Sequence, residues 1–140
     1  MAEDAVLLDT HVWWWFMMGS ERLQDSPALS LIRRAVAQRK VFVSVMSVWE
    51  MGMLEAKARI RFHQGLRIWV ESALAKPGIR LQGLTPSIAI ECTRLPGDFH
   101  PDPMDRILVA TARELDIPIL TADAAIIAYA NREYVKAVEV

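Results

Sequence analysis

The sequence has a single cysteine, Cys92, so the chain cannot form a disulfide with itself. This is typical of proteins in a reducing compartment, and we expect a cytoplasmic protein. Residues 1–4 are acidic and lack the basic start of a secretory signal. The longest apolar run, Val12–Met18, is far shorter than the roughly 20 residues that cross a bilayer. No membrane association is therefore expected.

The sequence also lacks an excess of charge of either sign. Its net charge of −1 excludes a strong overall attraction to nucleic acid, so such binding has to come from local basic patches. The chain has two clusters of cations, namely Lys57, Arg59 and Arg61, and Arg33, Arg34, Arg39 and Lys40. Each cluster is either the solvated end of a helix or a contact for phosphates.

Common signatures of nucleotide-binding and hydrolytic sites are missing as well. The chain has no Walker loop, no Gly-rich dinucleotide turn and no serine nucleophile elbow. Its histidines, His11, His63 and His100, do not have the spacing of a zinc site. We expect His63 at the surface, whereas His11 and His100 lie near acids in the sequence and are candidates for supporting a site.

Hydrophobic residues, in contrast, make up 53% of the sequence and fall into alternating strand-like and helix-like segments. Strands are predicted at 5–9, 41–44, 79–84, 117–121 and 134–138. Helices are predicted at 11–18, 26–38, 46–58, 64–75, 85–93, 103–115 and 124–130. This alternation predicts one domain over residues 1–140, with an α/β fold in three layers. Its centre is a mainly parallel sheet of four or five strands, covered by helices on both faces.

Four acids recur at the ends of these apolar segments. Asp9 ends one predicted strand and Asp123 lies two residues past another, Glu50 lies about a turn into a helix that follows a strand, and Asp105 lies in the first turn of a helix. The carboxyl ends of parallel strands meet at one edge of a sheet, which is where ligands bind in open α/β folds. We therefore expect the four acids to cluster there.

Each acid also has a local explanation as a helix cap. Ser47–Glu50 matches a capping box, and Asp102 before Pro103 suits an N-cap. Capping does not require four carboxylates at one edge, however, and clustered carboxylates repel one another. A divalent cation would neutralise them, and oxygen ligands favour Mg²⁺ or Mn²⁺. Such a site suits an in-line displacement at phosphorus, which is the chemistry of a nuclease or a phosphatase.

The helix predicted at 11–18 is apolar on all sides, so it is either buried or partly in contact with a partner. Together with the helix at 46–58 it would form a groove for a partner segment or a dimer contact. The candidate contact residues are Trp13, Trp14, Met17, Met18 and Met51. Trp14 also has the aromatic face on which an unpaired base stacks.

As a set, these motifs resemble PIN-domain proteins, and most closely the ribonuclease toxins of the VapC type in type II toxin–antitoxin systems. The segments that carry the resemblance are Leu7–Trp13, Ser47–Glu50, Asp102–Ala112 and Leu120–Asp123. They occur in the same order as in that family and extend over nearly the whole chain.

The resemblance implies an endoribonuclease that depends on Mg²⁺ or Mn²⁺ and cleaves RNA with a metal-activated water. The family's metal-binding and catalytic positions fall on Asp9, Glu50, Asp105 and Asp123. Thr10, Asp102 and Arg106 fall on positions that support the site. Arg106 would form a salt bridge to one of its acids, which we favour, or contact a phosphate. A VapB-type antitoxin partner and a homodimer are also implied.

Two other functions fit parts of the pattern. One is a non-catalytic PIN-like interaction protein, although such a protein would tolerate the loss of the four acids. The other is a receiver-like signalling module that binds Mg²⁺ and accepts a phosphoryl group. A receiver-like module requires a lysine at a late strand end, where this sequence has Leu120–Asp123.

Overall fold

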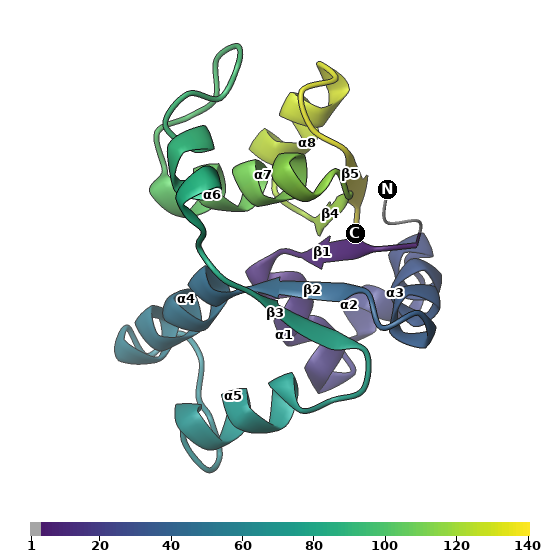
Figure 1. Cartoon of the computed structure of the whole chain (residues 1–140). Coiled ribbons are helices and arrows are strands. Elements are labelled where there is room, and N and C mark those ends of the chain that lie inside the picture. The colour runs from purple at the N-terminus through teal and green to yellow at the C-terminus, as the bar shows by residue number, and fades with distance from the viewer. Residues whose placement is uncertain (1–3) are drawn as a thin grey trace.

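The computed structural model describes residues 4–140 and contains one five-stranded parallel sheet (Figure 1). The strands are β1 Val6–Leu8, β2 Val41–Ser44, β3 Ile79–Gln82, β4 Ile119–Thr121 and β5 Ala137–Glu139. Their order in the sheet is β3-β2-β1-β4-β5, and each neighbouring pair is parallel. The first strand of the chain therefore lies at the centre of the sheet. This arrangement confirms the predicted fold class.

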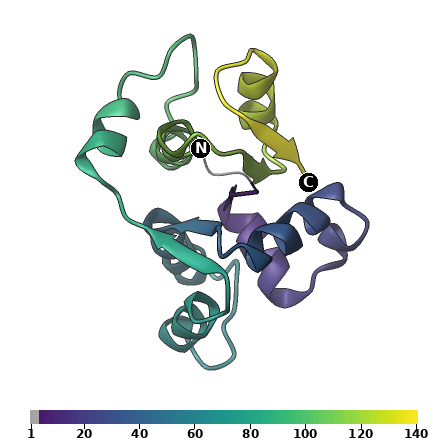
Figure 2. The ribbon, with the colours of Figure 1, turned by 45° about the vertical axis from the view of Figure 1, so that its right-hand side comes forward.

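Helices cover both faces of the sheet, as Figures 1 and 2 show. The helices are α1 Thr10–Met18, α2 Glu21–Gln24, α3 Pro27–Ala37, α4 Val45–Ala56, α5 Leu66–Leu74, α6 Pro86–Glu91, α7 Pro103–Leu115 and α8 Ala124–Asn131. Helices α6, α7 and α8 pack on one face, and the hydrophobic cluster between α1–α5 and the sheet fills the other.

The central strand explains why its sequence is apolar without alternation. Leu7 points into the cluster under α7 and α8, whereas Val6 and Leu8 point into the cluster under α1 and α3. All three are at most 2% exposed. A strand buried on both faces needs apolar side chains at every position, and this is typical of parallel sheets.

Several helices begin with a polar residue that caps the first turn. Ser44 caps α4 by accepting a hydrogen bond from the Met46 amide at 3.0 Å. The capping box predicted from Ser47 to Glu50 is therefore wrong, because the helix begins before Ser47, at Val45. Ser47 is instead a buried residue inside the helix, and its hydroxyl lies 2.8 Å from that of Thr10.

The structure differs from the predicted elements in two further places. The short helix α2, capped by Ser20, was not predicted, because a single turn is too short to show a helical period. The last strand begins at Ala137 rather than 134, after a turn in which Glu133 has a positive φ of 68°. No helix in the described part of the chain is long and apolar enough to cross a membrane.

Candidate metal centre

Two of the acids are brought together by the pairing of β1 with β4. Leu8 lies opposite Leu120 in the register, and the amide of Asp9 donates to the carbonyl of Leu120 at 3.0 Å. Asp9 follows β1 directly, and Asp123 follows the end of β4 by two residues. Both carboxylates therefore lie at the same edge of the sheet, as the predicted parallel arrangement requires.

The other two acids reach this edge from helices. Glu50 is the sixth residue of α4, and Asp105 lies in the first turn of α7. Together with the first two, they line a single cavity of about 310 Å³. The residues that line it are Asp9, His11, Trp15, Glu50, Asp102, Met104, Asp105, Ala122 and Asp123. None of these described residues is a lysine or an arginine, so the cavity holds a concentration of negative charge.

Asp9 is the most enclosed of the four carboxylates. Its Oδ1 accepts a hydrogen bond from the amide of Thr10 at 2.7 Å, and its Oδ2 accepts one from the hydroxyl of Thr121 at 2.6 Å. Burial raises the pKa of the Asp9 carboxyl above its ordinary value, although both hydrogen bonds act in the opposite direction. The two bonds fix the orientation of the carboxylate.

Thr121 was not singled out from the sequence, yet it connects two acids of the site. Its buried hydroxyl donates to Asp9 and accepts from the amide of Asp123 at 2.9 Å. The only sequence signal for this role is its place as the last residue of a strand next to β1. The Asp123 carboxylate caps α8 through Oδ1, which accepts from the amides of Ala125 and Ile126.

Replacing Thr121 by valine should test this connection, because valine has a similar shape and no hydroxyl. We expect the free energy of unfolding to fall by about 1–3 kcal/mol, since the Asp9 carboxyl group and the amide of Asp123 both lose their partner. Urea denaturation would measure the change. The matched control is Thr93→Val, which removes an exposed hydroxyl that bonds the carbonyl of Ile90. Equal stabilities for the two variants would contradict the proposed contribution of Thr121.

Asp105 carries the clearest electrostatic sign of crowding. Burial, together with the carboxylates of Asp123 and Asp102, raises its pKa to about 7. The protein therefore holds this acid in a place where its charge is unfavourable without a cation. One ligand atom from each of His100, Asp105 and Asp123 can lie within 4.8 Å of the others, which is close enough to surround one ion. Asp9 and Glu50 line the cavity outside this group.

His100 contacts Asp105, whereas the sequence indicated only that His100 is near acids along the chain. Its Nε2 is 3.3 Å from Oδ2 of Asp105, and its Nδ1 accepts from the amide of Asp102 at 3.3 Å. The ring also stacks on Phe99, with the ring centroids 4.3 Å apart. Because Nδ1 is an acceptor, the neutral ring carries its proton on Nε2, which faces the carboxylate.

Arg106 does not form the predicted salt bridge to an acid of the site. Its Nε donates to the carbonyl of Cys92 at 2.8 Å, and its Nη1 donates to the carbonyl of Phe99 at 3.0 Å. A sequence motif shows that an arginine is adjacent to an acid, but not the direction of its side chain. Arg106 therefore holds the loop before α7, which carries His100.

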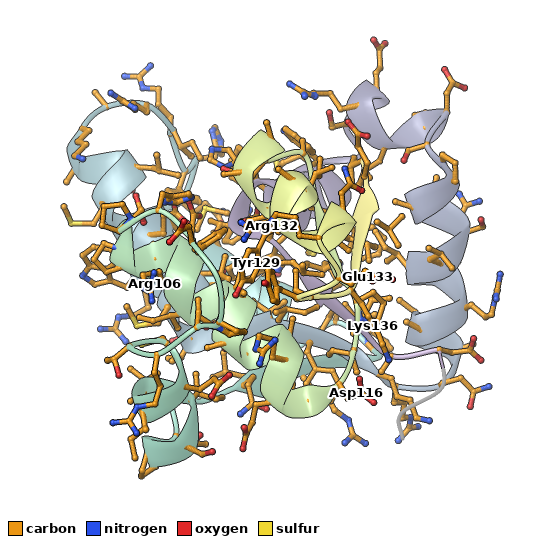
Figure 3. All side chains as sticks on the ribbon, turned by 90° about the horizontal axis from the view of Figure 1, so that it is seen from above. Arg106, Asp116, Tyr129, Arg132, Glu133 and Lys136 are labelled. Carbon is orange, nitrogen blue, oxygen red and sulfur yellow. The ribbon has the colours of Figure 1, made fainter. Side chains whose placement is uncertain are left out.

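The same loop is held from a second side. The hydroxyl of Tyr129 donates to the carbonyl of Pro96, and Arg132 donates to the carbonyl of Asp98 at 3.0 Å. Figure 3 labels these two side chains and Arg106. Gly97 fits this packing because its φ is +66° and a Cβ there would lie 2.6 Å from the ring of Tyr134. The loop that presents His100 is thus tied to α7 and α8.

Asp102 and Thr10, the other predicted support residues, both act at helix starts. Asp102 caps α7 by accepting from the amides of Met104 and Asp105 at 2.9 and 3.2 Å. The Thr10 hydroxyl contacts Ser47 rather than an acid, so it joins α1 to α4. The Thr10 side chain therefore holds together the two helices that present Asp9 and Glu50.

The predicted partner surface is only partly exposed to solvent. Trp13 and Met51 are completely buried, so their assignment as partner contacts is wrong. A helix that is apolar on all sides does not indicate which side faces the core. Trp14 is half-buried against Phe62 and Trp69, and Met17 is also half-buried. Met18 is 56% exposed and remains open to a partner.

Comparisons with known proteins agree with this architecture. The PIN domain family model matches residues 6–132. Ribonuclease VapC22 of Mycobacterium tuberculosis is 34% identical over 118 residues, which are 84% of this chain and 86% of that protein.

Solved structures with the same fold include FitAB bound to an IR36 DNA fragment, with a TM-score of 0.62, 17% identity and coverage of 96% of this chain and 94% of that chain. FitAcB from Neisseria gonorrhoeae has a TM-score of 0.59, 17% identity and coverage of 94% and 95%. VapBC2 from Rickettsia felis, bound to a DNA fragment from its promoter, has a TM-score of 0.62, 10% identity and coverage of 96% and 98%. At these identities the structures show the fold alone. From the family model and the VapC22 match, the chain belongs to the PIN-domain family and is of the VapC type.

Proposed function

We propose that this protein is an endoribonuclease dependent on a divalent cation and that it acts as the toxin of a toxin–antitoxin pair. The observation that carries the proposal is the cavity in which Asp9, Glu50, Asp105 and Asp123 meet without a lining lysine or arginine. The name of the M. tuberculosis relative, a ribonuclease, supports RNA as the substrate.

The residues present fit a hard divalent cation. Carboxylate oxygens predominate among the possible ligands, and this favours Mg²⁺ or Mn²⁺. Asp9, Glu50, Asp105 and Asp123 would hold it. Bound there, the cation would supply the positive charge that activates a water and stabilises the charge developing on the phosphodiester. The raised pKa of Asp105 supports this donor set, because no described lysine or arginine lines the cavity to offset its charge.

The surrounding residues orient the carboxylates. Thr121 fixes Oδ2 of Asp9 by donating to it, and Asp9 lines the cavity in which the cation would lie. His100 has its Nε2 proton toward Oδ2 of Asp105, so we assign it to positioning Asp105 rather than to binding the cation. Asp102 acts through the first turn of α7, which it caps next to Asp105.

The direct test is cleavage of a mixed-sequence single-stranded RNA by the purified protein. We expect cleavage with Mg²⁺ or Mn²⁺, its loss on adding EDTA, and its return when the cation is restored in excess. Titration calorimetry should show binding of Mn²⁺ by the wild-type protein, independently of activity. Cleavage that continues in EDTA would contradict the metal dependence. Cation binding without any cleavage would favour the non-catalytic PIN-like interaction protein.

The partner part of the proposal is an antitoxin of the VapB type. The VapC type of the chain supports it. Expression of the protein alone should arrest growth of the host, and co-expression of the antitoxin should restore it. We also propose a homodimer, which light scattering on the purified protein would measure. A receiver-like module is not favoured, because the family model that matches the chain is the PIN domain.

A further inference from the structure

We call the cavity lined by Asp9, Glu50, Asp105 and Asp123 the acidic cavity. A second cavity, of about 640 Å³, adjoins it. We call it the aromatic groove. It lies between α1, α4, the segment after α4 and the start of α7, and it is lined by His11, Trp14, Trp15, Met46, Trp49, Glu50, Met53, Leu54, Lys57, Arg59, Ile60, Asp102, Pro103, Met104 and Ile107. Glu50 and Asp102 line both cavities, so the groove is continuous with the candidate metal centre.

The groove contains a large aromatic side chain that the fold leaves uncovered. Trp49 is 54% exposed and comes directly before Glu50 in α4. Met53, one turn further along α4, is 37% exposed. Trp13, in contrast, is completely buried, and Trp14 packs against Phe62 and Trp69. Trp49 and Met53 together form an uncovered apolar surface beside the candidate active site, and such a surface indicates a ligand with an apolar face.

Charge along the groove changes from negative to positive. The end shared with the acidic cavity carries Glu50 and Asp102, and the other end carries Lys57 and Arg59. Both cations are exposed, and neither forms an ion pair with another described residue. This end is therefore free to contact an anionic group, whereas the acidic end needs a cation. Once a cation is bound at the acidic end, a nucleotide strand suits both ends, with one phosphate at the metal centre and another at Lys57 and Arg59.

We propose that the aromatic groove binds an unpaired nucleotide next to the scissile phosphate of the RNA. Its base stacks on Trp49, and its neighbouring phosphate contacts Lys57 and Arg59. This inference rests on the proposed ribonuclease function and assigns to Trp49, Lys57 and Arg59 the contacts to the RNA beside its scissile phosphate. A base in a duplex has both faces covered by its neighbours, so it cannot stack on Trp49. The protein should accordingly cleave a single strand in preference to the same strand in a duplex.

The test of the stacking contact is the kinetics of cleavage of a short fluorogenic single-stranded RNA in Mg²⁺. Trp49→Ala should raise KM by about 5- to 140-fold, the range of one base–aromatic stack, with a smaller effect on kcat. Trp49→Phe should recover much of the loss, since phenylalanine retains an aromatic face. The matched control is Ile68→Ala, because Ile68 is 51% exposed and lies outside the groove.

The test of the phosphate contact is the salt dependence of kcat/KM. For a single strand, each phosphate that the protein neutralises adds about 0.7 to the logarithmic salt slope. Lys57→Ala with Arg59→Ala should therefore reduce the slope by about 0.7, because the two cations share one phosphate. The control pair is Lys76→Ala with Arg80→Ala, two exposed cations outside the groove, which should leave the slope unchanged.

The outcomes separate this inference from the proposed function. If wild-type protein cleaves RNA and Trp49→Ala does so with the same KM, the base-stacking site is absent and the ribonuclease function stands. If Trp49→Ala keeps its RNA kinetics but loses binding of the antitoxin, the groove is a protein-docking surface and the inference is overturned. If wild-type protein cleaves RNA with neither Mg²⁺ nor Mn²⁺, the proposed ribonuclease function is wrong, and the inference that rests on it is overturned as well.

Discussion

Replacing Asp105 by asparagine should reduce RNA cleavage by about 100-fold or more, the usual cost of removing one group that stabilises charge in a transition state. Asparagine keeps the size of the side chain but cannot offer a charged ligand. Asp105 lies in the first turn of α7 and faces Asp123 across the acidic cavity. Calorimetric titration with Mn²⁺ should show a matching loss of affinity, which does not depend on the activity assay.

The same substitution should stabilise the metal-free protein at alkaline pH. The pKa of Asp105 is raised from 3.8 to about 7, so the folded protein holds this proton more tightly than the unfolded chain does. As pH rises from about 4 to 7, the folded state alone retains the proton, and the stability of the wild-type protein falls. Above pH 7 the penalty is complete. Asp105→Asn removes a cost on the order of 2 kcal/mol at pH 8, where the conversion allows for partial solvent screening.

Urea denaturation in EDTA at pH 5 and pH 8 would measure both parts of this expectation. The wild-type protein should lose stability between the two pH values, and Asp105→Asn should lose less. Asp116→Asn is the control, because Asp116 is exposed, pairs with Lys136 at 2.8 Å and lies outside the acidic cavity (Figure 3). If Asp105→Asn were less stable than wild type at pH 8, Asp105 would not be under electrostatic strain in the folded protein.

Replacing Trp13 by alanine should lower the free energy of unfolding by about 3–5 kcal/mol, the usual cost of deleting a fully buried aromatic side chain. Trp13 is 0% exposed and packs edge-on against Trp69, with the ring centroids 4.9 Å apart. Trp14 and Phe62 complete this aromatic cluster. A stability of about 5–15 kcal/mol is typical of a domain, so the variant should be close to unfolding at 37 °C.

Two variants of α1 make this measurement specific. Trp13→Phe should cost much less than Trp13→Ala, because the buried indole Nε1 has no hydrogen-bond partner among the described residues and its loss removes no bond. Met18→Ala, in the same helix, should change stability by no more than about 0.5 kcal/mol, since Met18 is 56% exposed. Similar stabilities for Trp13→Ala and Met18→Ala would show that Trp13 is not in the core.

Trp13 also connects the core to the candidate metal centre. Its amide donates to the carbonyl of Asp9 at 2.9 Å, in the first turn of α1. The packing of Trp13 against Trp69 therefore fixes the helix whose N-cap is the Asp9 carboxylate. The caps that explain Asp9, Asp102 and Asp123 locally are the same contacts that hold these acids at the sheet edge. The capping and site interpretations are thus compatible.

The sequence alone was sufficient to predict the fold class and to indicate four acids as candidates for the site. Val6–Leu8 is apolar at each position and ends on Asp9, so it predicts a strand buried on both faces with an acid at its carboxyl end. Because parallel strands end at one edge, the same rule indicates Asp123, and the helix that follows β2 indicates Glu50. Asp105 lies in the first turn of α7, which was expected to start at that edge and run back from it. These predictions rest on local periodicity and on a rule of topology, both of which can be read from residue types.

Only the tertiary structure decided which side chains meet around these acids. Thr121 and Asp9 are far apart in the sequence, and their hydrogen bond exists because β4 lies next to β1. Arg106 points to the loop carbonyls rather than to an acid, and α1, apolar on all sides, buries Trp13 but leaves Met18 exposed. Sequence spacing fixes geometry within one element, whereas these contacts depend on the order of strands and on how helices are rotated against the sheet. Those two quantities are set by packing over the whole chain.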